Sequence, residues 1–379
     1  GIKVVEIATI IAAPLGSSFL ADMGAEVIKI EPVGGDPFRG LLMGLGAARV
    51  NGGKRSIGLN LKSDQGKKIV LDLIKSADVL IHNFRPGVPE RLGIGYAEVS
   101  NLNPKIIYLQ SNGYGPDGPG AQRPSTHPIP GAAMGGVSYQ MGEKLPSELQ
   151  DIESLRLWTK RIMRANDVNP DPNTAMVVCT SVMLGLMARK TTGEGQQIFM
   201  DMFGANAYAN HDDFLTYPGK PQRALTDELM LGLNPTYRLY ECANQEWIFL
   251  ALVSAREKIR FKEILTNAGI ENDQISFGDT DLLASIEKLE ALFRNRSAED
   301  WEELLAPHGI GCVRADGHAS SQFWLEDEQV QTINLTKNTS YPSWGNYKRH
   351  GPTALFNCGV DHLKPAPFRG DDATYARQI

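Results

Sequence analysis

Cysteine is scarce in this chain of 379 residues. Zinc sites and redox pairs place two cysteines a few residues apart, and no two cysteines here share such a spacing. Cysteines that stand singly in a chain of this length are typical of a reducing compartment. We therefore expect a cytoplasmic protein with no metal site and with free thiols at Cys179, Cys242, Cys312 and Cys358.

The sequence also lacks an apolar run long enough to span a membrane, and it has no recognisable signal peptide. Its net charge is -6, so it lacks the basic excess that binding to nucleic acid needs. Neither membranes nor nucleic acids are therefore expected partners, although a local basic pocket for a small phosphorylated ligand fits this charge. The chain starts at Gly1 and stops at Ile379, and we expect both ends to be trimmed.

The first half of the chain alternates short segments rich in β-branched residues with segments of helical pattern. Such alternation predicts an α/β fold, with a Rossmann-like, doubly wound parallel sheet and helices on both faces. Ligands of such sheets bind outside the carboxyl ends of the strands. The predicted strands are 3–8, 26–31, 56–61, 78–84, 105–111 and 196–202, and helices are predicted at 15–24 and 64–77.

Binding of a dinucleotide is the first function that such a sheet suggests, and the loop after the first strand argues against it. That loop reads Thr9-Ile10-Ile11-Ala12-Ala13-Pro14 and has no G-x-G-x-x-G fingerprint. Glu31 ends the second strand, where an acid that binds the ribose would stand, but without the glycines this is weak support.

The pattern changes near residue 204, which predicts a division into domains. The segment 229–313 has a hairpin pattern over 236–253 that turns at Asn244-Gln245, followed by three helical patterns. After residue 314 we expect short strands only. The predicted parts are a large Rossmann-like domain over 1–203, a linker over 204–228, a small α+β domain over 229–313, a second linker over 314–335, and a return to the large domain over 336–379.

The stretch from Asp171 to Gln196 predicts a long helix. Asp171 suits the N-cap, because its carboxylate can accept hydrogen bonds from the amides of the first turn, and Pro172 suits the first helical position. Gly193 can end the helix. Apolar residues are spread broadly around it, so we expect it to be largely buried; they are Met176, Val177, Met183, Leu184, Leu186 and Met187. By this pattern alone, capping accounts for Asp171.

Five sequence blocks stand in a characteristic order. They are GIKVVEIATIIAAPLGSSFLADMGAEVIKIEPVGGDPFR (1–39), NGGKRSIGLNLKSDQGK (51–67), ADVLIHNFRPGVPERLGIGY (77–96), NPKIIYLQSNGYGPDGP (103–119) and ARKTTGEGQ (188–196). With these blocks, the chain resembles the family III CoA-transferases, a group that includes formyl-CoA transferase, carnitine CoA-transferase and α-methylacyl-CoA racemase. The closing GDDATYARQI also resembles the family's end.

The resemblance implies a catalytic role for Asp171, which stands at the family's aspartate position when counted back from Gln196. Its carboxylate would attack an acyl-CoA thioester, giving a mixed anhydride and then an aspartyl-CoA thioester. A carboxylic acid would collect the CoA by the reverse steps. The resemblance further implies that coenzyme A and acyl-CoA are substrates, with no tightly bound cofactor, and that the protein forms an interlocked homodimer.

The resemblance also implies where coenzyme A binds. It places the nucleotide near the ends of the first strands and the NFRPG loop, with Asn83, Phe84, Arg85 and Arg91 beside the pantetheine and phosphates. Lys62 would lie at the adenine or the 3′-phosphate, and Arg39 is a further candidate. Arginine suits this task because its forked donors match phosphate oxygens. The alternative is that Lys62, Arg85 and Arg91 are solvated surface cations.

Several departures from the family pattern narrow the activity. Ile11 stands where formyl-CoA transferase has glutamine, which argues against oxalate as the acceptor. The racemases have a His-Asp pair and a glutamate, but His127 falls one place late and Ser254 takes the glutamate's position. Racemisation needs two acid/base groups that flank one carbon. A racemase-like epimerase and a catalytically inactive CoA-binding paralogue are therefore the alternatives to the transferase. The segment 145–167 predicts an added helix next to the active site.

Overall fold

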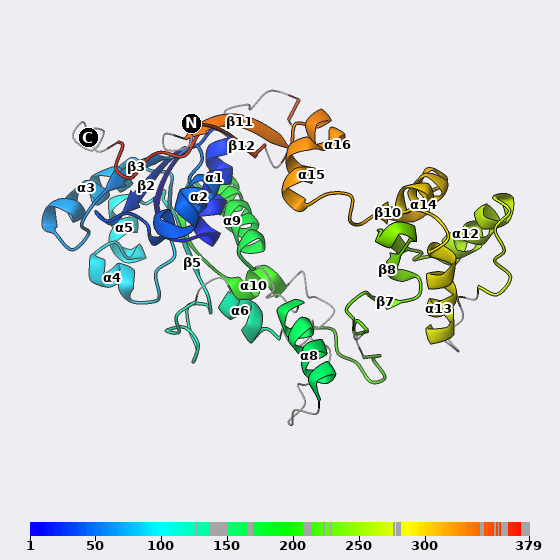
Figure 1. The fold of residues 1–379 in the computed structure, drawn as a ribbon. Coiled ribbons are helices and arrows are strands. Elements are labelled where there is room, and N and C mark those ends of the chain that lie inside the picture. The colour runs from blue at the N-terminus through cyan, green and yellow to red at the C-terminus, as the bar shows by residue number, and fades with distance from the viewer. Residues whose placement is uncertain are drawn as a thin grey trace. The chain divides into compact units, whose positions relative to one another are not determined.

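The computed structural model describes residues 1–125, 128–135, 151–164, 170–207, 214–222, 224–227, 229–275, 277, 282–341, 345–351, 354, 356–357 and 363–372. These residues form two compact units (Figure 1). The first unit comprises 1–134, 167–217 and 328–379, and the second comprises 135–166 and 218–327. Each unit has its own apolar core.

The first unit is built on a six-stranded parallel sheet with the strand order β3-β2-β1-β4-β5-β6. This order is that of the Rossmann fold, and it confirms the predicted fold class. All six expected strands are present, with ends that differ from the predicted ones by up to three residues. They are β1 (Lys3–Ile7), β2 (Glu26–Glu31), β3 (Arg55–Gly58), β4 (Val79–His82), β5 (Ile107–Asn112) and β6 (Gln196–Asp201).

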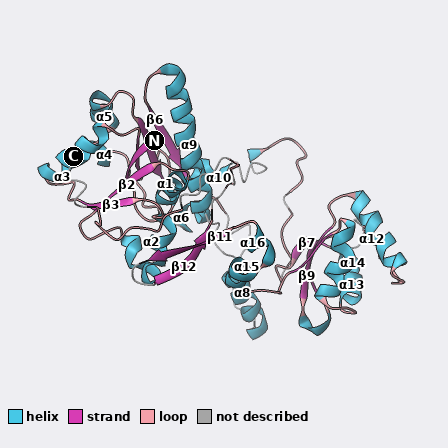
Figure 2. Cartoon of the chain, turned by 90° about the horizontal axis from the view of Figure 1, so that it is seen from above, coloured by secondary structure: helices cyan, strands magenta, loops and turns pink. Residues whose placement is uncertain are grey.

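Helices cover both faces of this sheet (Figure 2). On one face, α1 (Ala12–Asp22) and α9 (Pro170–Thr192) pack against the sheet and against each other. On the other face, α3 (Asp64–Lys75) buries Val70, Leu73 and Ile74 next to α5 (Tyr96–Leu102). The shorter helices of this unit are α2 (Leu45–Val50), α4 (Val88–Leu92), α6 (Pro128–Ala133), α10 (Met202–Ala207), α16 (Glu328–Thr332) and the 3-10 helix η1 (Pro37–Gly44).

Helix α9 differs from its prediction in two respects. It begins at Pro170, so Asp171 lies inside the first turn rather than at the N-cap. The expectation of a largely buried helix is wrong for one face of the single chain, where Met176, Met183, Leu184 and Met187 are exposed. The buried face carries smaller residues, among them Ala175, Val178, Cys179, Val182 and Gly185, because α1 and the sheet both approach it closely.

The end of the chain covers the edge of the sheet at β3. The Asp372 amide donates to the Ser56 carbonyl, and the Ser56 amide donates to the Asp372 carboxylate. The Gly53 amide donates to the Pro365 carbonyl. The free backbone groups of an edge strand can pair with another chain. Here the segment that ends at Asp372 forms hydrogen bonds with the amide and the carbonyl of Ser56 instead. Two further strands, β11 (Thr336–Tyr341) and β12 (Gly345–His350), form a separate ladder.

The second unit contains an antiparallel sheet of order β10-β9-β8-β7. The hairpin turns at Asn244 and Gln245, as predicted, and both residues have φ of 62°. Helices α12, α13 and α14 pack on the sheet around the buried Phe293 and Trp301. The elements are β7 (Gly232–Asn234), β8 (Tyr237–Glu241), β9 (Trp247–Ala251), β10 (Gly311–Arg314), α12 (Ala255–Asn267), α13 (Leu282–Phe293), α14 (Ala298–Leu305), and the 3-10 helices η3 (Ala243–Gln245) and η4 (Ala306–His308).

The chain after residue 314 departs from the prediction of short strands only. It contains α15 (Ser320–Glu326) as well as α16. Both helices have fewer than two full turns of apolar repeat, so their periodicity is too short to recognise in a segment rich in turn residues. The helix predicted over 145–167 is present in part as α8 (Ile152–Arg164), and its remaining residues lie outside the described ranges.

Candidate active site

A cavity of about 450 Å³ opens at the carboxyl ends of β1, β4 and β5. Its wall consists of residues 9–12 after β1, residues 83–85 after β4 and residues 111–113 at the end of β5. Arg123 to Ser125, Asp171 and Met202 complete the lining together with Val88 and Ala121. Parallel strands bring their following loops to the same edge of the sheet, which is why segments far apart in the sequence meet here.

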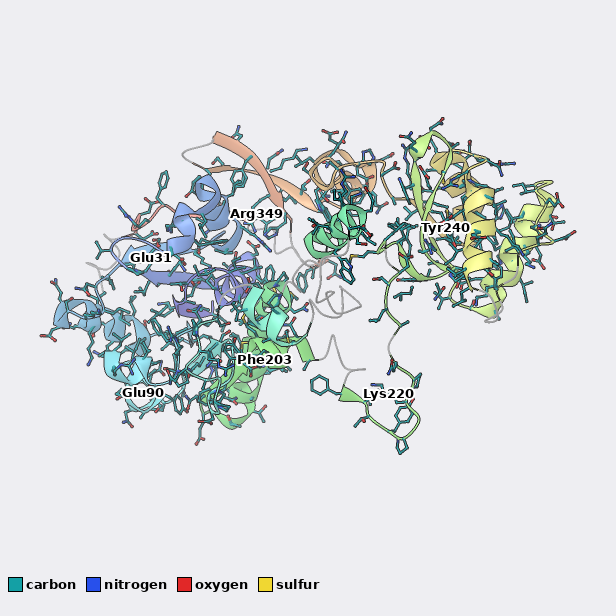
Figure 3. The ribbon with its side chains drawn as sticks, turned by 60° about the horizontal axis from the view of Figure 1, so that its bottom comes forward. Glu31, Glu90, Phe203, Lys220, Tyr240 and Arg349 are labelled. Atoms are coloured by element: carbon teal, nitrogen blue, oxygen red, sulfur yellow. The ribbon has the colours of Figure 1, made fainter. Side chains whose placement is uncertain are left out.

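Asp171 faces this cavity from the first turn of α9 and is only 3% exposed. The start of the helix is anchored by its neighbours. The Thr174 hydroxyl donates to the Pro170 carbonyl at 2.8 Å. The Asn206 side chain, on α10, donates to the Met202 carbonyl at 2.7 Å and accepts from Asn173 at 2.8 Å. Phe203, also on α10 and labelled in Figure 3, packs edge-on against Tyr114. The carboxylate of Asp171 is therefore carried by a fixed backbone.

Asn83 joins two loops of the cavity wall. Its side-chain oxygen accepts from the Thr9 amide at 3.1 Å, and its side-chain nitrogen donates to the Thr9 carbonyl at 2.9 Å. This pairing fixes the loop after β1 to the loop after β4. The sequence prediction placed Asn83 beside the ligand, and the structure places it in the lining while its amide is used to hold Thr9.

His82 orders the next residue of that loop, Phe84. The Phe84 amide donates to His82 Nδ1 at 3.3 Å, so His82 Nε2 carries the proton and donates to the Tyr108 hydroxyl at 2.9 Å. Tyr108 in turn donates to the Ile94 carbonyl at 3.0 Å. Burial lowers the pKa of His82 to about 3, so the ring is neutral at physiological pH. This neutral chain of hydrogen bonds positions Phe84 in the cavity wall.

The predicted cations do not all meet at the cavity. Arg85 lines it, is exposed, and donates to the Gln122 carbonyl at 3.0 Å. Arg123 also lines the cavity, and the sequence analysis missed it. The one signal for it in the sequence is that a basic residue follows GYGPDGP (113–119). Arg91 and Lys62 are exposed and lie outside the lining.

Arg39 is occupied by another partner. Its Nε and Nη2 donate to the two carboxylate oxygens of Glu31 at 2.7 and 2.8 Å, and its Nη1 donates to the Pro367 carbonyl. Glu31 also accepts from Ser56 and is 2% exposed. The acid that would bind a ribose in a dinucleotide fold therefore holds Arg39 and the end of the chain in place. Because the carboxylate of Glu31 is used in this way, its position at the end of β2 does not indicate a nucleotide site.

Four buried charges lie directly beneath the loop after β1. Lys29 contacts Glu6 at 2.8 Å and Asp36 at 3.0 Å, and Lys54 contacts Glu6 at 2.5 Å. All four side chains are fully buried, and their charges cancel. Burial alone would raise the pKa of Glu6, but the two lysines outweigh it and lower that pKa from 4.5 to about 2. Burial also lowers the pKa of Lys54 to about 8.

Glu6 should make the stability of this unit sensitive to acid. Its pKa is lower in the folded chain than in the unfolded chain, so its contribution is complete above about pH 5 and is lost as pH falls toward 2. We expect the free energy of unfolding to lose about 2 kcal/mol between pH 7 and pH 3 from this group. Denaturant titrations of the wild-type protein and of Glu6→Gln at several pH values measure this loss. The variant should be less stable at pH 7, but its free energy of unfolding should change less with pH. Equal slopes would contradict the assignment.

A larger hollow of about 830 Å³ lies in the second unit between α14, β10 and α15. It is lined by carboxylates such as Glu299, Glu303 and Asp327 and by the aromatic rings of Phe323 and Trp324. None of the predicted site residues lines it. We therefore take the smaller cavity as the candidate site, because its lining combines a buried carboxylate with basic side chains.

Among the residues that the structure describes, no group of three His, Cys, Asp or Glu side chains is arranged to hold a metal ion. None of the described helices is long and apolar enough to cross a bilayer. Three cysteines, Cys179, Cys242 and Cys312, are buried and unpaired with one another, and Cys358 lies outside the described ranges.

The chain matches a known protein family along nearly its whole length. The model of CoA-transferase family III matches residues 1–373. A "(R)-2-hydroxy-4-methylpentanoate CoA-transferase" from Clostridioides difficile is 27% identical over 98% of the chain and 92% of that protein. An "Acyl-CoA transferase" from Fusarium pseudograminearum is 37% identical over 54% of the chain, a match that spans 44% of that protein. A CaiB/BaiF family protein from Brucella suis shares the fold, with a TM-score of 0.74 at 23% identity and coverage of 100% and 98% of the two chains.

Proposed function

The chain belongs to CoA-transferase family III, and from this membership we propose that it moves coenzyme A from an acyl-CoA thioester to a carboxylic acid, with Asp171 as the nucleophile. One observation carries the assignment. Among the described residues that line the cavity, Asp171 is the one with a carboxylate. Ser111 and Ser125 also line it, but a serine nucleophile needs a base, and no described lining residue is a histidine.

The proposed reaction balances without any other reagent. An oxygen of Asp171 attacks the thioester carbonyl, and CoA leaves as the thiolate, which gives a mixed anhydride. The thiolate attacks the aspartyl carbonyl, releases the donor acid and leaves an aspartyl-CoA thioester. The carboxylate of the acceptor attacks this thioester, forming a second anhydride and free thiolate. Attack of the thiolate on the acceptor's acyl carbon yields the new acyl-CoA and restores Asp171.

Chemical trapping tests this mechanism. The protein is incubated with a panel of acyl-CoA donors, hydroxylamine or borohydride is added, and the modified residue is mapped by mass spectrometry. The panel includes the thioester of (R)-2-hydroxy-4-methylpentanoate, the acid named for the Clostridioides relative. Modification at Asp171 is expected. Modification elsewhere, or none with the whole panel, would refute the transferase.

The racemase alternative receives less support from the small unit. Ser254, at the position of the racemases' glutamate, caps α12, because its hydroxyl accepts from the Glu257 amide and donates to the Glu257 carboxylate. A hydroxyl used in this way is no acid/base group for a substrate. His127 lies outside the described residues. Exchange of an α-proton of the acyl-CoA for solvent deuterium would favour racemisation.

Arg85 is the cation that we propose for the phosphates of coenzyme A, with Phe84 against the pantetheine; Arg91 and Lys62 would act at longer range. Arg85→Ala removes a forked charged donor, so we expect the KM for the acyl-CoA to rise about 10-fold while kcat changes little. Steady-state kinetics measure this. Arg55→Ala, which removes an exposed arginine outside the cavity lining, is the control and should leave the KM unchanged.

We also propose that the protein is a homodimer, supported by the exposed apolar face of α9. Met176, Met183 and Met187 recur on one face of α9 at helical spacing and are 45%, 44% and 64% exposed. A row of exposed apolar side chains on one helix face is typical of an interface. Met183→Lys combined with Met187→Lys should therefore weaken the affinity of dimerisation by at least about 10-fold. Sedimentation velocity over a range of protein concentrations measures this affinity. Gln65→Lys, which changes an exposed residue of α3, is the control and should leave the affinity unchanged; a monomeric wild-type protein would refute the proposal.

A further inference from the structure

The backbone of Ile10 has an unusual conformation at the edge of the cavity. Its φ is 71°, in the left-handed region that β-branched residues rarely adopt because their side chain crowds the backbone. The residue lines the cavity, and its side chain packs against the core of α1 and α9. A strained conformation of this kind persists only where surrounding contacts impose it.

The contacts that impose it come from Asp36. The Ile10 amide donates to both carboxylate oxygens of Asp36, each at 3.2 Å. The Asp36 carboxylate is itself fixed, since it accepts from the Phe38 amide at 2.9 Å and contacts Lys29 at 3.0 Å. The side chains of Asp36 and Lys29 are fully buried, so water does not compete for these contacts.

Lys29 holds the same loop from its other side. Its ammonium donates to the Ala8 carbonyl at 2.7 Å and to Glu6 at 2.8 Å. Glu6 pairs with Lys54, whose ammonium donates to the Pro14 carbonyl at 2.7 Å. The buried charges therefore form hydrogen bonds with the backbone at Ala8, Ile10 and Pro14. Residues 9–12, which lie between these points, line the same cavity as Asp171.

We propose that Asp36 and Lys29 are positioning residues for CoA transfer: they keep the turn at Ile10 in its left-handed conformation and thereby shape the wall against which the acyl group meets Asp171. The inference rests on the proposed transferase activity. Neither residue lines the cavity, so their effect passes through the backbone of residues 9–12. Loss of geometry near a reacting group lowers the rate of the chemical step more than it lowers the affinity for substrate.

The main test replaces Asp36 with asparagine, which keeps the size of the side chain and one acceptor oxygen but removes the charge. We expect kcat to fall about 100-fold, with the KM for acyl-CoA within about threefold of wild type. Adding Ile10→Gly should recover at least about 10-fold of the lost kcat, because glycine adopts positive φ without restraint. Adding Ile10→Ala should not, since alanine keeps the steric cost.

Two readouts separate this inference from simple stabilisation and from the transferase assignment. A crystal structure of Asp36→Asn should show residue 10 out of the left-handed region, whether or not the protein transfers CoA. An unchanged φ, or an unchanged kcat per folded molecule, would overturn the inference. If Asp36→Asn does not fold, Asp36→Glu decides instead, because it keeps the charge but shifts the carboxylate that the Ile10 amide contacts: a fall in kcat with the KM near wild type supports the inference, and an unchanged kcat overturns it. A wild-type protein without transfer would refute only the activity.

Discussion

Replacing Asp171 with asparagine is expected to lower kcat for CoA transfer by at least about 10³-fold. The amide has nearly the same shape as the carboxylate, but its oxygen is a poor nucleophile and it cannot form the anhydride or regenerate the carboxylate. Asp171 is buried in the first turn of α9, and an uncharged side chain of equal volume should fit there without strain. Transfer of CoA between acids, followed by mass spectrometry of the products, measures the loss.

The Asp171→Asn protein must also be shown to keep an intact binding site for coenzyme A. Binding of free coenzyme A, measured by calorimetry, should stay within about threefold of wild type, because the proposed phosphate contacts come from Arg85 rather than Asp171. Asp64→Asn is the matched control. It removes a carboxylate from the first turn of α3, outside the cavity lining, and should keep full activity. An active Asp171→Asn protein would mean that another residue accepts the acyl group.

The sheet was predictable because each strand carries its own local pattern. Segments such as KVVEIA and DVLIHNF are rich in β-branched residues and are bounded by turn residues, so length and composition identify them. The hairpin of the second unit was equally local, since asparagine, here Asn244, readily adopts the positive φ that the turn requires. Helix α9 was harder. Apolar residues surround it, so its sequence does not tell which face packs on α1.

Apart from Asp171, which the family resemblance indicated, the predicted residues that line the cavity follow a strand. Asn83, Phe84 and Arg85 come directly after β4, and parallel strands bring such loops together. Arg39 was named as a further candidate for the ligand, and its ion pair with Glu31 could not be predicted from spacing because folding brings the two residues together. The conformation of Ile10 was also beyond the sequence, because Asp36 and Lys29 fix it across two strands and a loop. Sequence reasoning therefore found several of the groups that line the cavity, missed Arg123, and did not identify the buried residues that hold the cavity wall.

Gly16→Leu is expected to reduce the free energy of unfolding by about 3 kcal/mol or more. Gly16 lies within α1, where leucine is intrinsically favoured over glycine by about 1 kcal/mol. That gain is outweighed by the packing of α1 on α9. A Cβ atom at position 16 would lie 2.7 Å from the Ala175 carbonyl oxygen and 2.7 Å from Val178 Cβ, so backbone as well as side chain would have to move.

The movement should also reach the chemistry, because Ala175 lies one helical turn after Asp171 and the two share the start of α9. We expect the folded fraction of Gly16→Leu to transfer CoA about 100-fold more slowly than wild type. Denaturant unfolding and kcat corrected for folded protein are the measurements. Gly204→Leu is the control, since position 204 is exposed and its nearest neighbour lies 3.5 Å from an added Cβ. Equal stability of the two variants would show that α1 does not fix the helix that carries Asp171.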